Sequence, residues 1–310
     1  METVWTRKDL LSLYDLSADE IIFLLDTAEE FKKVSERNVK KVPALRGKTV
    51  VNFFVEPSTR TRVSFELAEQ RLSADIINVQ ASTSSLKKGE TLLDTIKNLE
   101  ALQVDLFVMR HASPGAQYFI AENTKCGVVN AGDGAHSHPT QALLDLFTIR
   151  EKKGHIDGLK VTILGDILHS RVARSNIWGL LKLGAEVTVA GPPTLVPREF
   201  ESIGVKVCHN LKDAVRDADV VNVLRIQHER LNASFFPSDS EYASFYGIKP
   251  GILDYMKPDT IIMHPGPINR DVEISSAIAD GSRSVILEQV TNGLAVRMAV
   301  LFLVAGCVKK

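Results

Sequence analysis

The sequence of 310 residues has no excess of basic side chains, because 37 Lys and Arg stand against 38 Asp and Glu, a formal net charge of −1. A protein that binds nucleic acid or an acidic membrane surface needs a face of clustered positive charge. The even balance therefore argues against nucleic-acid and membrane partners. It also predicts that any anion site is local and built from a few arginines.

Long apolar runs and a leader pattern are also missing. No run reaches 18 uninterrupted apolar residues, and Met1–Lys8 lacks the basic and then apolar pattern of a signal peptide. Only three cysteines occur, and Cys126, Cys208 and Cys307 fit neither a disulfide framework nor a zinc spacing. We therefore expect buried thiols, a cytoplasmic location and no membrane span.

A glycine-rich dinucleotide fingerprint is absent as well. Residues 161–166 read as a buried strand that ends in Gly165 and Asp166, where G-x-G-x-x-G would have to begin. Bulky residues and Arg171 follow instead. This pattern argues against a nucleotide-linked dehydrogenase and favours an anion held by Arg171.

What the sequence does have is a regular alternation of strand and helix patterns. Residues 17–20 form a capping box that begins a helix, and alternation after it is typical of parallel sheets with helices on both faces. The length predicts two α/β domains, 1–150 and 151–284, with the active site in the cleft between them and a last helix near 285–310 packed back on the first. The expected strands are 49–54, 75–79, 105–109, 126–130, 160–164, 186–190, 205–208, 219–223 and 260–263, and the longer helices are 59–72, 91–102, 114–122, 139–152 and 171–183.

The densest polar motif, 56–62, follows the first strand, where ligands bind in parallel sheets. Ser58, Thr59 and Thr61 offer hydroxyls, Arg60 offers a planar cation, and the helix that starts here offers free N–H groups. An ordinary helix cap with solvated arginines is the alternative, but it does not require so many hydroxyls and arginines together. The motif therefore predicts a phosphate site.

Other arginines and histidines also follow strands. Arg110 ends one strand of the first domain, while Arg171 and Arg225 follow strands of the second and suit a small dicarboxylate, unless each pairs with a local carboxylate. His136 and His138 form a His-x-His pair. No third ligand has a suitable spacing, so we expect no metal.

The motif at 56–62 closely resembles the carbamoyl-phosphate signature of the aspartate carbamoyltransferase catalytic chains, and the resemblance extends over the whole sequence. It implies transfer of the carbamoyl group of carbamoyl phosphate to the α-amine of L-aspartate, giving N-carbamoyl-L-aspartate and phosphate, the committed step of pyrimidine biosynthesis, with no cofactor. The other motifs that carry it, in order, are 84–91, Arg110, 138–141, Arg171, 225–227 and 264–270.

The resemblance also implies a role for each matching residue. Arg60, Thr61, Lys88, Arg110 and His138 would be catalytic. Carbamoyl phosphate would contact Ser58, Thr59, Arg60, Thr61, Ser84, Lys88, Arg110, His138, Gln141, Pro265 and Gly266. Aspartate would contact Lys88, Arg171, Arg225 and Gln227. Glu56 would pair with Arg171 and Arg230 when the domains close.

The same resemblance implies a homotrimer with shared active sites, in which the loop from Ser84 to Lys88 reaches a neighbouring subunit. Either Ser84 or Ser85 can be the serine that matches the family, and the spacing to Lys88 favours Ser84. Regulatory chains or dihydroorotase are possible further partners of such a trimer.

Two alternatives compete with this interpretation. Ornithine carbamoyltransferases share the two-domain plan, but they carry His-Cys-x-Pro where this sequence has His264-Pro-Gly-Pro267, and the expected acceptor residues are arginines rather than acids. A scaffold without catalysis would not need Arg60, Lys88 and His138 intact. Aspartate is therefore the expected acceptor.

Overall fold

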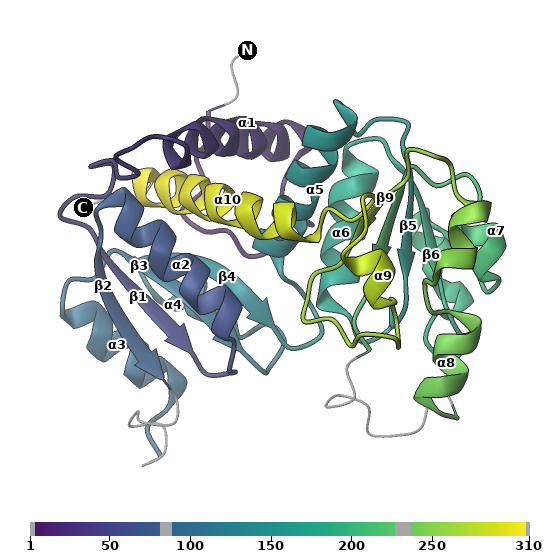
Figure 1. Ribbon diagram of the computed structural model, residues 1–310. Coiled ribbons are helices and arrows are strands. Elements are labelled where there is room, and N and C mark those ends of the chain that lie inside the picture. Colours follow the sequence, from purple (N-terminus) through teal and green to yellow (C-terminus); the bar gives the residue numbers. More distant parts are fainter. Residues whose placement is uncertain (1–3, 81–88, 227–236, 308–310) are drawn as a thin grey trace. The chain divides into compact units, whose positions relative to one another are not determined.

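The structure, a computed structural model, describes residues 4–80, 89–226 and 237–307. The chain divides into two compact units, Met1–Phe147 with Thr291–Lys310 and Thr148–Val290 (Figure 1). Both points of division lie inside helices, α5 (Pro139–Lys153) and α10 (Ile286–Cys307). Each unit has its own sheet.

The sheet of the first unit has the strand order β2-β1-β3-β4, and every pair in it is parallel. The β-branched and aromatic composition of β1 explains its burial, since both faces of a parallel sheet are covered. The strands are β1 (Thr49–Phe54), β2 (Asp75–Gln80), β3 (Leu106–His111) and β4 (Gly127–Asp133), and the helices are α1 (Ala18–Ser35), α2 (Thr59–Leu72), α3 (Leu92–Ala101) and α4 (Ala116–Asn123).

Helices cover both faces of this sheet. Val51, Phe53 and Phe107 belong to one apolar cluster with Ile96 of α3 and Ile120 of α4. On the opposite face of β1, the Asn52 amide contacts Glu69 of α2. Because side chains alternate along a strand, one strand supplies both layers of the core.

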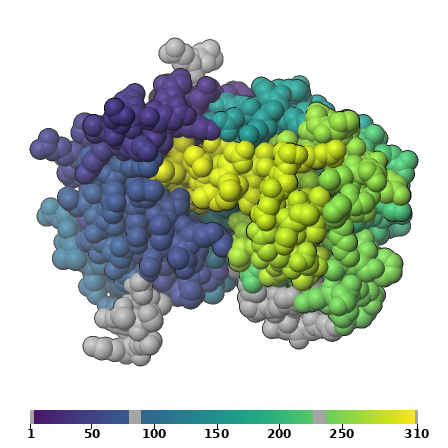
Figure 2. Space-filling view, in the orientation of Figure 1, coloured from purple at the N-terminus to yellow at the C-terminus, as the bar shows by residue number. Residues whose placement is uncertain are grey.

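The end of the chain belongs to the first unit. The Phe302 ring of α10 meets the Phe31 ring of α1 edge-on at 5.5 Å between centroids, and Lys32 donates to Asn292 Oδ1 at 2.9 Å. In Figures 1 and 2, this yellow segment of α10 lies beside the purple α1 and the blue α2. The last helix thus packs under the N-terminal helix.

The second unit has a five-stranded parallel sheet in the order β7-β6-β5-β8-β9. Helix α6 (Arg171–Lys182) and helix α7 (Leu211–Val215) both pack against it. Its strands are β5 (Lys160–Leu164), β6 (Glu186–Ala190), β7 (Lys206–Cys208), β8 (Val220–Val223) and β9 (Ile261–Met263), and its shorter helices are η3 (Arg198–Ile203), α8 (Asp239–Phe245), η5 (Pro250–Tyr255) and α9 (Ser276–Ala279).

The structure confirms the α/β class with two parallel sheets, and all nine expected strands are present within three residues of their expected ends. The capping box at Ser17 and Glu20 is formed in both directions. The sequence missed the short helices of the second unit, because one or two turns are too brief to show a helical period.

One expectation, that all three thiols are buried, needs correction. Cys126 is buried, but Cys208 and Cys307 are partly exposed, because they lie at an edge strand and at a helix end. Of the helices that the structure describes, α10 is long and apolar enough to cross a membrane by length and composition, although 67% of its most apolar stretch is buried within the protein. Polar residues such as Asn292 and Arg297 interrupt its sequence, so a search for an unbroken apolar run passed over it.

Candidate active site

The motif 56–62 forms the turn from β1 into α2. Ser58 is the N-cap of α2, yet its side chain accepts no hydrogen bond from the helix, and the first turn holds no acidic residue. The N-caps Ser17, Thr91 and Ser170 do accept such bonds. The start of α2 therefore offers N–H groups and a positive dipole end that no carboxylate of its first turn neutralises.

Arg60 and Thr61 lie in the first turn of α2, where Arg60 is exposed and Thr61 is buried. Thr59 is exposed and Ser58 is half-buried. An accessible guanidinium at the N-terminus of a helix is suited to binding phosphate. The local geometry agrees with an anion site.

Arg110, the second-to-last residue of β3, lies beside this turn, because Phe54 of β1 is paired with it in the sheet. The residue is 8% exposed, and its Nη1 donates to the Ala131 carbonyl at 3.2 Å. Its Nη2 lies 2.5 Å from Glu56 Oε1. Glu56, expected from the resemblance to pair on closure, thus contacts an arginine of its own unit, an ion pair that the sequence did not predict.

The segment from β4 to α5 positions His138 and Gln141. Asp133, which is fully buried, accepts hydrogen bonds from the Ser137 N–H at 2.8 Å and the Gly115 N–H at 3.0 Å, and His136 Nδ1 lies 3.0 Å from it. His136 therefore has a structural contact. The fixed turn places His138, 5% exposed, directly before α5.

Gln141 lies in the first turn of α5, on the same side of the helix as His138 three residues earlier. Its Nε2 donates to Asp145 Oδ1 at 3.0 Å, and Asp145 is fully buried. This bond restricts the orientation of the Gln141 side-chain amide. The sequence had not identified Asp145.

In the second unit, Arg171 begins α6, whose N-cap Ser170 accepts from the Ala173 N–H at 3.1 Å. Gly165 has φ +130° and passes so close to Leu224 that a Cβ would lie 3.1 Å from the Leu224 Cβ, which favours glycine. Arg171 is 5% exposed, and Arg225, after β8, is half-buried. Both arginines follow adjacent strands, β5 and β8.

The loop after β9 is built around His264, which is almost fully buried. The Gly266 N–H donates to His264 Nδ1 at 2.8 Å, so His264 Nε2 carries the proton and donates to Glu273 Oε1 at 3.2 Å. Gly266 has φ +63°. These bonds fix the path of Pro265 and Gly266, both half-buried.

Several predicted residues lie outside the described part of the chain. These residues are Ser84, Ser85, Lys88, Gln227 and Arg230. Among the residues that are described, no group of three His, Cys, Asp or Glu side chains is placed to hold a metal ion.

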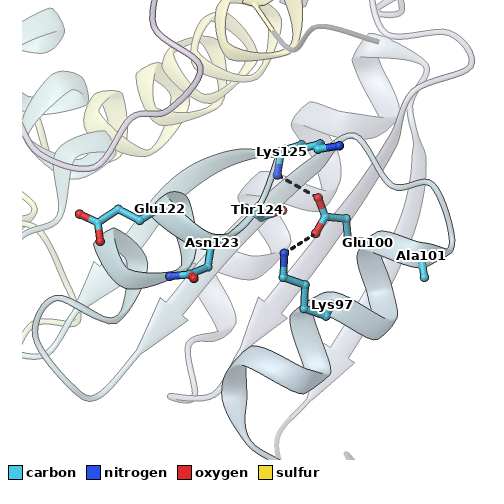
Figure 3. A pocket seen from close by; sticks show the side chains of 7 residues that line it. All are labelled: Lys97, Glu100, Ala101, Glu122, Asn123, Thr124 and Lys125. Carbon is cyan, nitrogen blue, oxygen red and sulfur yellow. Dashed lines mark hydrogen bonds and ion pairs between the residues drawn. The ribbon is translucent and has the colours of Figure 1, made fainter.

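A surface hollow of about 730 Å³ in the first unit contains none of the predicted residues. It lies at the C-terminal ends of α3 and α4, where the Lys125 N–H donates to Glu100 at 2.9 Å and Lys97 lies 3.4 Å from the same carboxylate (Figure 3). The carboxylate is already bonded within the protein. The start of α2 therefore remains the candidate anion site of the first unit, in preference to this hollow.

The fold and the site define a class: an α/β protein with two parallel sheets, each presenting arginines beyond the C-terminal ends of its strands. Two family models match the chain, the carbamoyl-P binding domain of aspartate/ornithine carbamoyltransferases over residues 8–151 and the Asp/Orn binding domain over residues 157–304. The chain belongs to the aspartate/ornithine carbamoyltransferase family.

Curated relatives and solved structures agree with this assignment. The chain is 60% identical over 302 residues to an aspartate carbamoyltransferase catalytic subunit from Syntrophus aciditrophicus, covering 97% of this chain and 98% of the relative. A crystal structure of aspartate transcarbamoylase from Trypanosoma cruzi with N-(phosphonacetyl)-L-aspartic acid is 30% identical, with a TM-score of 0.87 and 96% of each chain covered. Ornithine carbamoyltransferase from Pyrococcus furiosus is 34% identical, with a TM-score of 0.87, covering 99% of this chain and 100% of that one.

Proposed function

We propose that the protein is an aspartate carbamoyltransferase: it transfers the carbamoyl group of carbamoyl phosphate to the α-amine of L-aspartate, and phosphate leaves. The observation that carries this proposal is the start of α2, with an N-cap that makes no cap bond, no acid in the first turn and the exposed Arg60. The identity of 60% to a curated aspartate carbamoyltransferase catalytic subunit supports aspartate as the acceptor.

In the first unit, the phosphate would bind Ser58, Thr59, Arg60 and Thr61 at the positive end of α2. Arg110 and His138, with Thr61, would donate to the oxygen of the carbamoyl group as negative charge develops on it. Gln141, held by Asp145, would contact the carbamoyl NH₂.

For the acceptor, Arg171 and Arg225 at adjacent strand ends would hold the two carboxylates of aspartate, as paired arginine forks do. The uncharged amine then attacks the carbamoyl carbon, and the C–O bond to phosphate breaks. No side-chain nucleophile is required, because the substrate supplies its own amine.

The remaining parts of the proposal come from the resemblance. Ser84 and Lys88 would complete the carbamoyl-phosphate site from a neighbouring subunit of a homotrimer, Lys88 and Gln227 would contact aspartate, and Pro265 and Gly266 would contact the carbamoyl group. Glu56 would pair with Arg171 and Arg230 on closure. A cytoplasmic location and a step of pyrimidine biosynthesis follow from the same proposal.

The test is an assay of the purified protein with carbamoyl phosphate and either L-aspartate or L-ornithine. We expect N-carbamoyl-L-aspartate and stoichiometric phosphate with aspartate, and no citrulline with ornithine. Ornithine turnover, or no turnover with either amine, would refute the proposal. Because the Pyrococcus furiosus relative is similar in fold, the fold does not separate the two activities, and this comparison of acceptors does.

A further inference from the structure

Arg297 is a cation enclosed in the interior of the first unit. It is 5% exposed and lies in α10, a mainly apolar helix in which it is the one basic residue. Burial lowers the pKa of Arg297 to about 10, while the negative charge of Asp145 opposes that shift. An arginine in an apolar interior is unfavourable unless other groups hold its charge, so its contacts matter.

One contact leads to the phosphate-binding helix. Arg297 Nη1 donates to Ser64 Oγ of α2 at 2.9 Å, and its guanidinium lies 5.2 Å from the centre of the Phe65 ring. Ser64 follows Arg60 by four residues, one turn along the same helix. The guanidinium therefore supports the turn of α2 that directly follows the proposed anion site.

The second contact is electrostatic and leads to Gln141. Asp145, whose charge favours the protonated form of Arg297, accepts the hydrogen bond from Gln141 Nε2 at 3.0 Å. Arg297 thus acts at once on both sets of residues that would bind carbamoyl phosphate.

The backbone of α10 leaves room for this side chain. A Cβ at Gly293, one turn before Arg297, would lie 2.6 Å from Arg297 Nη1. Glycine in the middle of a helix lowers its stability, so its presence here fits a requirement for space.

We infer that Arg297 is a positioning residue for carbamoyl phosphate, which holds the first turns of α2 through Ser64 and the Gln141 amide through Asp145. The inference rests on the proposed function, since it names the substrate that both groups bind. Arg297 itself is buried behind these residues and acts through them.

The test compares the KM for carbamoyl phosphate, at saturating aspartate, in wild-type protein and Arg297→Met. We expect KM to rise about tenfold while kcat changes much less, because the lost interaction supports binding of the ground state and the transition state alike. Ser64→Ala and Gly293→Ala should raise KM in the same direction by smaller factors. Arg297→Lys, which keeps the charge near Asp145 but not the planar fork, should fall between wild type and Arg297→Met.

Lys32→Met is the matched control, because Lys32 also donates to α10, through Asn292. It should lower stability and leave KM unchanged. An unchanged KM in Arg297→Met, or an equal rise in Lys32→Met, would overturn the inference. If Arg297→Met does not fold, Ser64→Ala carries the test, since it removes a single hydroxyl and an unchanged KM in it has the same meaning.

A second measurement separates this inference from the proposed function. The dissociation constant for inorganic phosphate, measured by calorimetry, should be several-fold weaker in Arg297→Met than in wild type whether or not carbamoyl transfer occurs. Wild-type protein without activity would refute the proposed function alone. Active wild-type protein, with equal phosphate affinity and KM in the variant, would refute the role of Arg297 alone.

Discussion

Glu69, on the sheet-facing side of α2, is a carboxyl group buried with one partner, and its protonation can be tested. It is fully buried, and Asn52 Nδ2 donates to its Oε2 at 2.7 Å. The other oxygens of this pair, Glu69 Oε1 and Asn52 Oδ1, are buried acceptors with no donor among the described residues. A proton on Glu69 Oε1 would turn this buried acceptor into a donor.

Burial raises the pKa of Glu69 to about 8 from its ordinary 4.5, although the Asn52 bond opposes this shift. The folded protein therefore binds this proton more tightly than the unfolded chain does. The stabilisation that results is fully present below the unfolded pKa and is lost as the pH rises through about 8. The free energy of unfolding should fall by up to about 1.4 kcal/mol per pH unit in this window, roughly 5 kcal/mol in all as an upper bound.

Glu69→Gln removes the titration and keeps the size and a donor. We expect the variant and the wild type to differ by a small amount at pH 5, and the variant to be more stable by several kcal/mol at pH 8.5. Urea unfolding at fixed protein concentration measures this difference. In a Trp178→Phe background, the fluorescence of the buried Trp5 reports the unfolding of the first unit.

Glu100→Gln provides the control in the same unit. Burial alone would raise the pKa of Glu100, but hydrogen bonds from the Lys125 N–H and from Lys97 lower it overall. Its stabilisation is lost only as the pH falls below the ordinary value, so this variant should differ from wild type by a constant amount between pH 5 and 8.5. The same constant difference for Glu69→Gln would refute a retained proton on Glu69.

Three further predictions concern activity. Arg60→Ala should lower the rate by about 10²–10³ with an unchanged urea midpoint. Arg62→Ala is the control, since it removes an arginine that pairs with Glu66 on the same helix, and it should stay active. A joint loss of stability and rate in Arg60→Ala would show that Arg60 is structural. In a second test, inactive Arg60→Ala and Lys88→Ala chains are mixed, unfolded and reassembled. If neighbouring subunits of a ring share each active site, about a quarter of the sites should recover activity. No activity in well-formed mixed trimers would exclude shared sites. Glu56→Gln should raise the KM for aspartate more than that for carbamoyl phosphate, whereas equal losses would assign Glu56 to holding Arg110.

The sequence predicted most strands and the longer helices because their signals are local. The run from Thr49 to Phe54 contains the β-branched and aromatic residues of a buried strand, and Ser17 with Glu20 caps a helix through its own neighbours. The short helices, such as α7, contain too few residues to show a period. Tertiary contacts decide them instead.

The candidate site was also predictable only in part. The hydroxyls and Arg60 of the anion turn are adjacent in sequence, so their chemistry shows without a fold. The supporting residues could not be predicted, because they are not adjacent in sequence. Asp145 and Arg297 lie far apart in the chain, and Glu56 contacts Arg110 only because β1 and β3 pair in the sheet. Arg297 left one signal, a lone basic residue in an apolar run.

By itself, the sequence determined the alternation of elements, the family and the residues that present charge at the strand ends, because each depends on residue type and short spacing. Only the tertiary structure decided which buried groups support them. Asn52 meets Glu69 through the packing of α2 on β1, and Arg297 meets Ser64 through the packing of α10 on α2. Burial and distance between residues remote in the chain set the pKa of Glu69, and neither quantity exists before the chain folds.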